Sequence, residues 1–281
     1  MMACLATVVA TAGAMADDYR PFVAAKAIWP GGRALEKNLQ VGFRAVIQNE
    51  GGGPTVLRLT ASTLYRASVN GKLVGYGPAR GPHGWYRVDE LDISKALKAG
   101  KNVVAVEVAG YNVNSYYTID EPSFLQAEVV RDGRALAATG KGSPEGFDAA
   151  ILSERVQKVQ RYSFQRPFSE VYRLRPDHDR WKVDSKAAFE SVACVVEEDT
   201  RRYLPRVSPY PDYALRKQPL VVGRGEIVPQ PNPGSLWKDR SLTGISGKLK
   251  GYPESELAII PSIDMQKVKS RPDPTVSPEK E

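Results

Sequence analysis

The sequence predicts an all-β protein, an antiparallel β-sandwich of the jelly-roll type with a proline-rich C-terminal extension. Three observations lead to this class. Short stretches rich in β-branched and aromatic residues recur at intervals of about 8–12 residues, as in sandwiches. The dipeptides Asn70-Gly71 and Asp132-Gly133 lie where tight hairpin turns would join such stretches. No window carries four turns of helical periodicity, so helices contribute little.

The predicted sandwich occupies residues 17–176. Its expected strands alternate between apolar and polar positions or form short apolar runs. The predicted strands cover 41–48, 57–65, 67–76, 102–110, 125–131, 134–138, 147–152, 156–163 and 171–174. A single capped helical turn is expected at residues 94–100, where Gly100 follows the turn.

Two further segments follow the sandwich. Residues 177–233 are expected to form one more strand, at 188–196, and then an extended linker, because seven prolines fall between Pro205 and Pro233. Proline cannot donate a ladder hydrogen bond, which argues against a central sheet there. Residues 234–281 are expected to be the remnant of a second domain, ending in a polar, disordered tail.

Composition excludes several classes of protein. The 281 residues leave room for two domains at most, and 42% hydrophobic with 25% charged residues is ordinary for a globular chain. The longest uncharged apolar stretch is residues 1–16, shorter than the ~20 residues that a membrane-spanning helix needs. We therefore expect neither a disordered protein nor a membrane span.

The N-terminus predicts export. Residues 3–16 are small and apolar, they end in an Ala-x-Ala site at Ala16, and the charged chain begins at Asp17. This is typical of a signal peptide over residues 1–16 and of a secreted or periplasmic protein, although no basic residue precedes the apolar part. The alternative is a disordered or buried N-terminal strand. Cleavage would remove Cys4 and leave Cys194 as the one thiol, so no internal disulfide is expected.

The motifs of common enzymes and metal sites are missing. The glycines of residues 75–81 miss the dinucleotide-binding spacing, and no Gly-x-Ser-x-Gly elbow occurs. The two histidines, His83 and His178, fall in predicted loops, and two His with two Cys do not predict a zinc site of the common Cys/His kind. We predict no catalytic residue, no metal site and no cofactor.

Calcium is the one cation that the acidic residues suit, since it prefers oxygen ligands. Asp89, Asp92 and Asp120 lie near predicted turns, but their spacing matches no known calcium loop. Asp89, Glu90 and Asp92 are instead expected to be ordinary solvated acids, because a glycosidase needs two carboxyls facing each other across a cleft.

One stretch has the composition of a sugar-binding surface. Aromatic rings there alternate with amide and guanidinium donors, and a sugar can lay its C–H face on a ring while its hydroxyls take hydrogen bonds. The candidate carbohydrate-binding residues are Arg80, Trp85, Tyr86, Tyr111, Asn112, Asn114, Tyr116 and Tyr117. The alternative is that these rings belong to the core and to a contact between domains.

Basic residues concentrate between Glu154 and Lys182. Interleaved aromatics give this segment some likeness to a nucleic-acid-binding face. The export signal and the lack of recognised motifs argue against that partner. We expect no nucleic acid, and an acidic polysaccharide or a neighbouring domain fits the basic segment better.

Several longer motifs resemble one enzyme family. They are a strand with a Val-Asn-Gly hairpin, a Gly/Pro-rich loop, a Gly-Lys-Asn-Val-Val-Ala-Val strand and a Phe-Gln-Arg-Pro-Phe-Ser-Glu segment, at residues 61–75, 75–93, 100–117 and 164–170. Together they resemble the N-terminal β-sandwich region of bacterial α-L-rhamnosidases and related glycoside hydrolases, over about residues 20 to 260. The third motif is also shared loosely with galactose-binding-like jelly rolls of many glycosidases.

This resemblance implies a part in carbohydrate degradation without catalysis by this chain. In the family the acid and base carboxylates lie in a downstream α/α barrel, and no run of paired long helices is predicted here. We therefore expect the non-catalytic N-terminal portion of a secreted rhamnosidase-like enzyme, truncated before its barrel and inactive alone. Its expected partners are the missing catalytic domain and carbohydrate, such as rhamnose-containing glycans. The alternative is a stand-alone carbohydrate-binding module or adhesin-like protein.

Overall fold

The structure is a computed structural model that describes residues 19–142, 145–159, 161, 167–197, 200–212, 214, 220–221, 225–229, 251–258, 268–272 and 279–280. The predicted signal peptide and most of the predicted C-terminal tail lie outside these residues. The chain divides into two compact units, of which the first holds residues 1–157 and 170–210 and the second holds 158–169 and 211–281. The domain boundaries expected from the sequence remain predictions.

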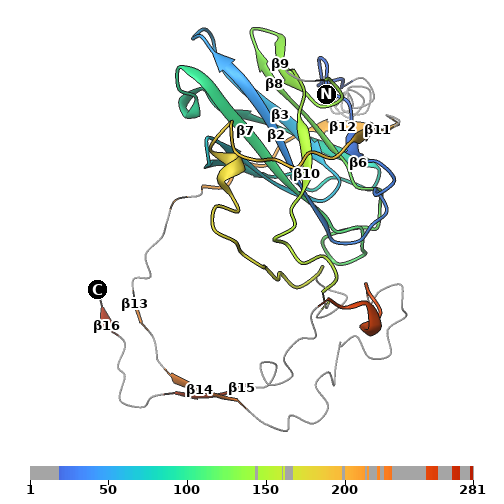
Figure 1. Ribbon diagram of the computed structural model, residues 1–281, viewed down its shortest axis with the longest axis vertical. Coiled ribbons are helices and arrows are strands. Elements are labelled where there is room, and N and C mark those ends of the chain that lie inside the picture. The colour runs from blue at the N-terminus through green and yellow to red at the C-terminus, as the bar shows by residue number, and fades with distance from the viewer. Residues whose placement is uncertain are drawn as a thin grey trace, which may run out of the picture. The chain divides into compact units, whose positions relative to one another are not determined.

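The first unit is an antiparallel β-sandwich, which confirms the predicted fold class (Figure 1). One sheet has seven strands in the order β11-β1-β8-β3-β6-β12, with β9 paired to β8. Its strands are β1 (Ile28–Pro30), β3 (Thr55–Ala61), β6 (Trp85–Asp92), β8 (Leu125–Arg131), β9 (Arg134–Ala138), β11 (Cys194–Val196) and β12 (Arg202–Pro205). Among the described strands of this sheet, β6 and β12 form the one parallel pair.

The second sheet of the sandwich has five strands in the order β10-β2-β7-β4-β5. They are β2 (Leu39–Asn49), β4 (Leu64–Val69), β5 (Lys72–Gly77), β7 (Gly100–Gly110) and β10 (Asp148–Ile151). The central β2–β7 pair is the longest ladder and runs without a break from Leu39↔Gly110 to Asn49↔Gly100. Both predicted hairpin turns are present, between β4 and β5 and between β8 and β9.

The core lies between the two sheets and is made by every second residue of each strand. A strand places successive side chains on opposite faces, so a period of two builds one apolar face. The fully buried core residues include Val41, Phe43 and Ala45 of β2, Leu57 and Leu59 of β3, Val104, Val106 and Val108 of β7, and Leu125, Ala127 and Val129 of β8.

A smaller apolar cluster covers part of the outer face of the five-stranded sheet. Trp181, in the short 3-10 helix η2 (Arg180–Lys182), packs with Leu152 and Phe189 on Val103 and Ala105 of β7. Gly42 of β2 permits this close approach, since a Cβ there would lie 2.8 Å from both Trp181 and Leu152. Other outward positions of this sheet carry polar side chains, among them Gln40, Arg66 and Glu107.

Five strand predictions were wrong in detail. The stretch 67–76 contains the Asn70-Gly71 turn and so belongs to both β4 and β5, and 171–174 has only an isolated bridge at Tyr172. The strand expected over 57–65 is two strands, β3 and β4, which belong to different sheets, because the chain crosses the edge of the sandwich at Ser62 and Thr63. Residues 156–159 form no strand, and most of the remaining residues of the predicted strand 156–163 lie outside the described part of the chain. The strand expected over 188–196 is confined to β11 and a bridge at Val192.

Of the remaining predictions, the helical turn was confirmed and the strands of one sheet edge were missed. The turn at 94–100 is the 3-10 helix η1 (Ser94–Ala96), and Gly100 has the expected positive φ of 82°. The sequence predicted no strand for β6 or β12, which together form one edge of the larger sheet.

Within the described residues, no helix combines the length and apolar character needed to cross a bilayer.

The described part of the second unit contains two short antiparallel pairs. β13 (Leu220–Val221) pairs with β16 (Glu279–Lys280), and β14 (Gly225–Pro229) pairs with β15 (Val268–Pro272). The 3-10 helix η3 (Glu254–Glu256) also belongs to this unit. Near it, the Phe168 and Tyr252 rings pack with centroids 5.7 Å apart.

Candidate functional site

The predicted carbohydrate-binding residues Arg80 and Tyr117 lie together at the surface. Tyr117 is 61% exposed, and the Arg80 guanidinium carbon lies 4.7 Å from the centre of its ring. Such stacking fixes the flat guanidinium while its N–H edge stays available to a ligand. Tyr116 is also exposed, at 60%.

Trp85 and Tyr86 lie at the start of β6, where alternation points their side chains to opposite faces of the sheet. Trp85 is half-buried beneath Arg202 of β12, whose guanidinium carbon is 4.6 Å from the ring centre. The Tyr86 hydroxyl donates to Glu121 Oε2 at 2.6 Å. Burial raises the pKa of Tyr86, and the bond to Glu121 adds to that rise, so the hydroxyl stays protonated and acts as a donor.

Asn112 and Asn114 serve the loop itself. Asn112 is buried and donates from Nδ2 to the Leu35 carbonyl at 2.5 Å, with a positive φ of 42°. Asn114 donates to Asp120 Oδ1 at 2.7 Å and accepts from the Asp120 backbone N–H. Both amides are thereby engaged in holding the loop that follows β7.

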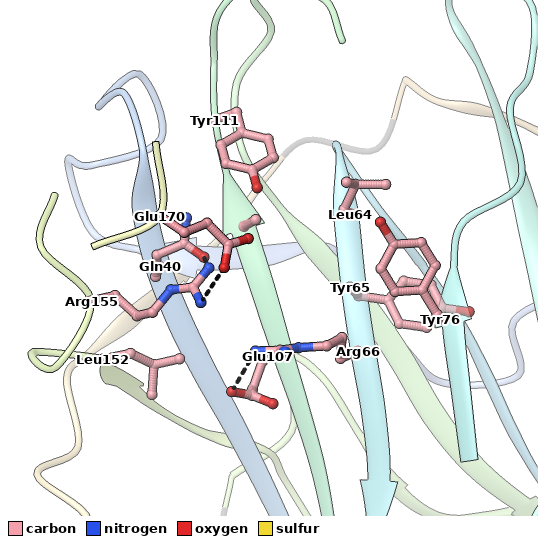
Figure 2. A pocket seen from close by; sticks show the side chains of 11 residues that line it. Gln40, Leu64, Tyr65, Arg66, Tyr76, Glu107, Tyr111, Leu152, Arg155 and Glu170 are labelled. Atoms are coloured by element: carbon pink, nitrogen blue, oxygen red, sulfur yellow. Dashed lines mark hydrogen bonds and ion pairs between the residues drawn. The ribbon is translucent and has the colours of Figure 1, made fainter. Parts of the chain in front are cut away.

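Tyr111, which is also among the eight predicted residues, lines a pocket that the sequence did not predict. This pocket lies on the outer face of the five-stranded sheet and has a volume of about 120 Å³ (Figure 2). Its floor is made by outward-facing positions of β2, β4 and β7, and Arg155 and Glu170 form one wall. The lining residues are Gln40, Leu64, Tyr65, Arg66, Tyr76, Glu107, Ala109, Tyr111, Leu152, Arg155 and Glu170.

A short antiparallel ladder holds the Arg155–Glu170 wall in place. The Val156 N–H donates to the Val171 carbonyl at 2.9 Å, and the Arg173 N–H donates to the Glu154 carbonyl at 2.8 Å. Arg155 and Tyr172 form an isolated bridge in the same ladder. The wall therefore consists of two chain segments that brace each other above the sheet.

The pocket contains two ion pairs. Arg66 Nη2 lies 3.4 Å from Glu107 Oε1, and Arg155 Nη1 lies 3.3 Å from Glu170 Oε2. Arg155 also donates to Gln40 Oε1 at 3.4 Å. Two arginines and two glutamates make the formal charge of the lining zero.

The second pair has additional support from Tyr172. Its hydroxyl donates to Glu170 Oε2 at 2.9 Å, and the Arg155 guanidinium carbon stacks 4.3 Å from the centre of its ring. The side chain of Arg155 is only 11% exposed, compared with 48% for Arg66. Arg155 is therefore the fixed cation of the pocket and Arg66 the accessible one.

Two tyrosines border the space between the ion pairs. Figure 2 shows the Tyr111 hydroxyl pointing toward Glu170 and Tyr76 lying beside Leu64. Tyr111 is buried and Tyr76 is 41% exposed. Burial raises the pKa of both tyrosines, so both remain neutral phenols that can donate and accept.

Four basic residues of the segment 154–182 pair with nearby acids. Besides Arg155, Lys182 lies 3.7 Å from Glu107 Oε2, and Arg180 lies 3.3 Å from Asp184 Oδ2. In the second unit, Lys158 pairs with Glu256 at 3.0 Å. These pairs weaken the case for the segment as a free basic stripe.

The acids named for calcium lie in different surroundings. Asp89 is fully buried and bonded to Arg206, Asp92 accepts from the Ser94 N–H at 2.9 Å, and Asp120 is bonded to Asn114. The described residues hold no grouping of three or more His, Cys, Asp or Glu side chains suited to a metal ion.

No protein-family model matches the chain, and no curated protein matches it. Among solved structures, a GH78 family rhamnosidase from Bacillus sp. GL1 is similar to it, with a TM-score of 0.59 and 26% identity over 73% of this chain. The predicted resemblance to rhamnosidases is confirmed. The matched region is 21% of that rhamnosidase, so the chain spans about a fifth of its length.

Two further α-L-rhamnosidases also align with the sandwich. The one from Aspergillus terreus has 18% identity and a TM-score of 0.48, over 63% of this chain and 21% of its own. The one from Dictyoglumus thermophilum has 15% identity and a TM-score of 0.48, over 66% of this chain and 22% of its own.

Proposed function

We propose that this chain forms a non-catalytic, carbohydrate-binding part of a secreted α-L-rhamnosidase-like glycoside hydrolase. The observation that carries the proposal is the similarity of its β-sandwich to about a fifth of the GH78 family rhamnosidase. In such an enzyme the sandwich would bind glycan while a separate α/α barrel supplies the acid and base. Rhamnose-containing glycans are the proposed ligands.

The described carboxylates support a binding role. A glycosidase needs one carboxyl that keeps its proton in apolar surroundings and a second one facing it. In the pocket, Glu107 and Glu170 are each paired with an arginine instead. Asp89 is sealed inside the sandwich by Arg206, and Glu121 is bonded to Tyr86.

A stand-alone carbohydrate-binding protein is the second candidate. The first unit favours it because one sandwich provides the complete lining of the pocket. Both candidates predict sugar binding, and they differ in the size of the native protein.

Two measurements on the same preparation test these candidates. An immunoblot of source cells with antibodies against residues 17–281 should show a band far above 30.8 kDa if the sandwich works within a larger enzyme. A band near 30.8 kDa would favour the stand-alone binder. The purified chain should release no product from an aryl α-L-rhamnoside, and turnover that survives further purification would contradict the non-catalytic role.

A further inference from the structure

The outer face of the five-stranded sheet has a closed part and an open part. Trp181, Leu152 and Phe189 close the part over Val103 and Ala105. The open part presents Gln40, Arg66 and Glu107 at outward positions of β2, β4 and β7. Because the outward positions of these adjacent strands lie side by side, their polar groups face the same space.

We propose, on the basis of the proposed function, that this pocket binds one neutral sugar residue by its hydroxyl groups. The cavity volume of about 120 Å³ is enough to admit several water-sized groups. It is well below the ~300 Å³ at which pockets for drug-sized ligands begin. A single sugar residue, inserted by one edge, fits this size better than an oligosaccharide lying along the sheet.

The ion pairs supply the hydrogen-bonding groups that a sugar edge requires. An arginine carries five N–H donors and a carboxylate about four acceptor positions. In the described part of the chain, Arg66 bonds only through Nη2 and only to Glu107. Arg66 and Glu107 can thus contact neighbouring hydroxyls, one as donor and the other as acceptor, without breaking their own pair.

Tyr111 and Glu170 complete the set of polar groups on the other side. The Tyr111 hydroxyl points into the space near Glu170 (Figure 2), whereas Gln40 is buried, its amide oxygen accepting from Arg155 and its Nε2 donating to Asn38 Oδ1 at 3.2 Å. Leu64 and the half-exposed Tyr76 give an apolar border, suited to the C–H face of a ring. Polar groups on two sides and an apolar border on the third match the surface of a sugar.

The charge balance selects a neutral ligand. Both arginines in the lining already face a carboxylate, so a uronic acid would bring a third anion close to Glu107 and Glu170. Lys182, 3.7 Å from Glu107, balances part of the charge there, so the preference for a neutral sugar rests on Glu170, which pairs only with Arg155 among the described cations. Like-charge contacts of this kind discriminate between ligands by adding an unfavourable term for one of them.

Calorimetric titration of the full chain tests the inference. The probes are methyl α-L-rhamnoside, methyl β-D-galactoside and galacturonate. Arg66→Gln and Tyr76→Ala alter exposed positions, so both variants should fold, and circular dichroism checks this. Each should weaken binding of the neutral sugar at least tenfold. Arg134→Gln, an exposed arginine on β9 in the other sheet, is the matched control and should bind like the wild type.

Each result has a distinct meaning. Loss of binding in Arg66→Gln and Tyr76→Ala, with binding retained in Trp85→Ala, supports the pocket. Retained binding in the two pocket variants with loss in Trp85→Ala would overturn the pocket and leave the proposed function standing. Tighter binding of galacturonate than of the neutral sugars would overturn the charge argument. If the wild type binds none of the probes, the proposed function fails as well.

Discussion

Asp89 carries a buried negative charge inside the sandwich, and we expect the stability of the fold to depend on it. Its side chain is fully buried; it accepts from the Tyr65 hydroxyl and, at 2.9 Å, from Arg206 Nη1. Burial raises the pKa of Asp89, while the bonds from Tyr65 and Arg206 oppose that rise. Gly77 leaves room for the carboxylate, because a Cβ there would overlap Asp89 Oδ2.

We predict that Asp89→Asn lowers the free energy of unfolding by about 3 kcal/mol. The variant removes the counter-ion of Arg206, which is itself only 9% exposed, and an uncompensated buried charge is costly. Urea unfolding measures the loss. Asp92→Asn, on the same strand but exposed, is the control and should change stability by less than about 1 kcal/mol. Equal effects of the two variants would show that the buried pair is not important.

Cys194 gives a prediction about pH. The thiol is half-buried against the core, and burial raises its pKa to about 11. Because only the thiolate reacts, about one thousandth of this thiol is reactive at pH 8, and the fraction grows about tenfold per pH unit up to pH 11. A chain with Cys4→Ser should therefore react slowly with a disulfide reagent at pH 8. Complete labelling within seconds would contradict this environment.

At the residue scale, the residues predicted to bind sugar and the pocket of the structure overlap little. Tyr111 is the one predicted residue that lines the pocket. Arg155 and Glu170 were visible only as part of a charged segment, since nothing local shows that they pair above β2. The sequence did contain one signal for the pocket. Three otherwise apolar strands carry a polar residue at an outward position: Gln40, Arg66 and Glu107.

Among the elements, the N-terminal segment before β1 is held by a single buried carboxylate. Glu128 of β8 is fully buried and accepts the N–H groups of Val23, Ala24 and Ala25 at 2.9–3.1 Å. Arg58 of β3 donates to the same carboxylate at 3.0 Å and to the half-exposed Glu90 at 2.7 Å. Glu128 thus ties the segment to the outer face of the larger sheet.

We predict that Glu128→Gln loosens this segment and lowers the free energy of unfolding by about 3 kcal/mol. The Gln side chain can accept fewer of these hydrogen bonds. It also removes the inner counter-ion of Arg58, which is partly buried. Limited trypsin digestion should cut faster at Lys26, and urea unfolding should give the free-energy loss. Glu90→Gln removes the outer partner of the same arginine and should cost at most about 1 kcal/mol. Unchanged proteolysis in Glu128→Gln would contradict the role given to Glu128.

Local signals predicted the elements that depend on local chemistry. The turns at Asn70-Gly71 and Asp132-Gly133 formed because Asn70 and Asp132 tolerate the positive φ, of 51° and 48°, that such turns need. The break at Ser62 was missed, since crossing from one sheet to the other leaves the apolar alternation unchanged. β12 was missed because its pairing partner, β6, lies more than a hundred residues earlier.

At the scale of the whole molecule, we propose that the protein is exported. Residues 1–16 are expected to be removed, so the mature chain should begin at Asp17. Mass spectrometry of the protein from the culture medium or periplasm should give the N-terminal peptide starting at Asp17. Recovery of the intact N-terminus, in the cell interior only, would contradict export.

The architecture links the fold to the proposed function in a simple way. One sheet face is buried in the core, and the outer face of the five-stranded sheet is divided between an apolar cover and a polar pocket. The sandwich therefore carries a pocket on regular strands, with one wall from Arg155 and Glu170.

The most direct test of the account is calorimetric titration of the full chain with methyl α-L-rhamnoside and methyl β-D-galactoside. At about −0.3 kcal/mol per non-hydrogen atom, a sugar residue of about a dozen such atoms gives a Kd of about 1–10 mM. We predict saturable binding in this range for at least one neutral sugar, with one site per chain. A flat trace for both sugars at tens of millimolar would contradict the central claim that this sandwich binds carbohydrate.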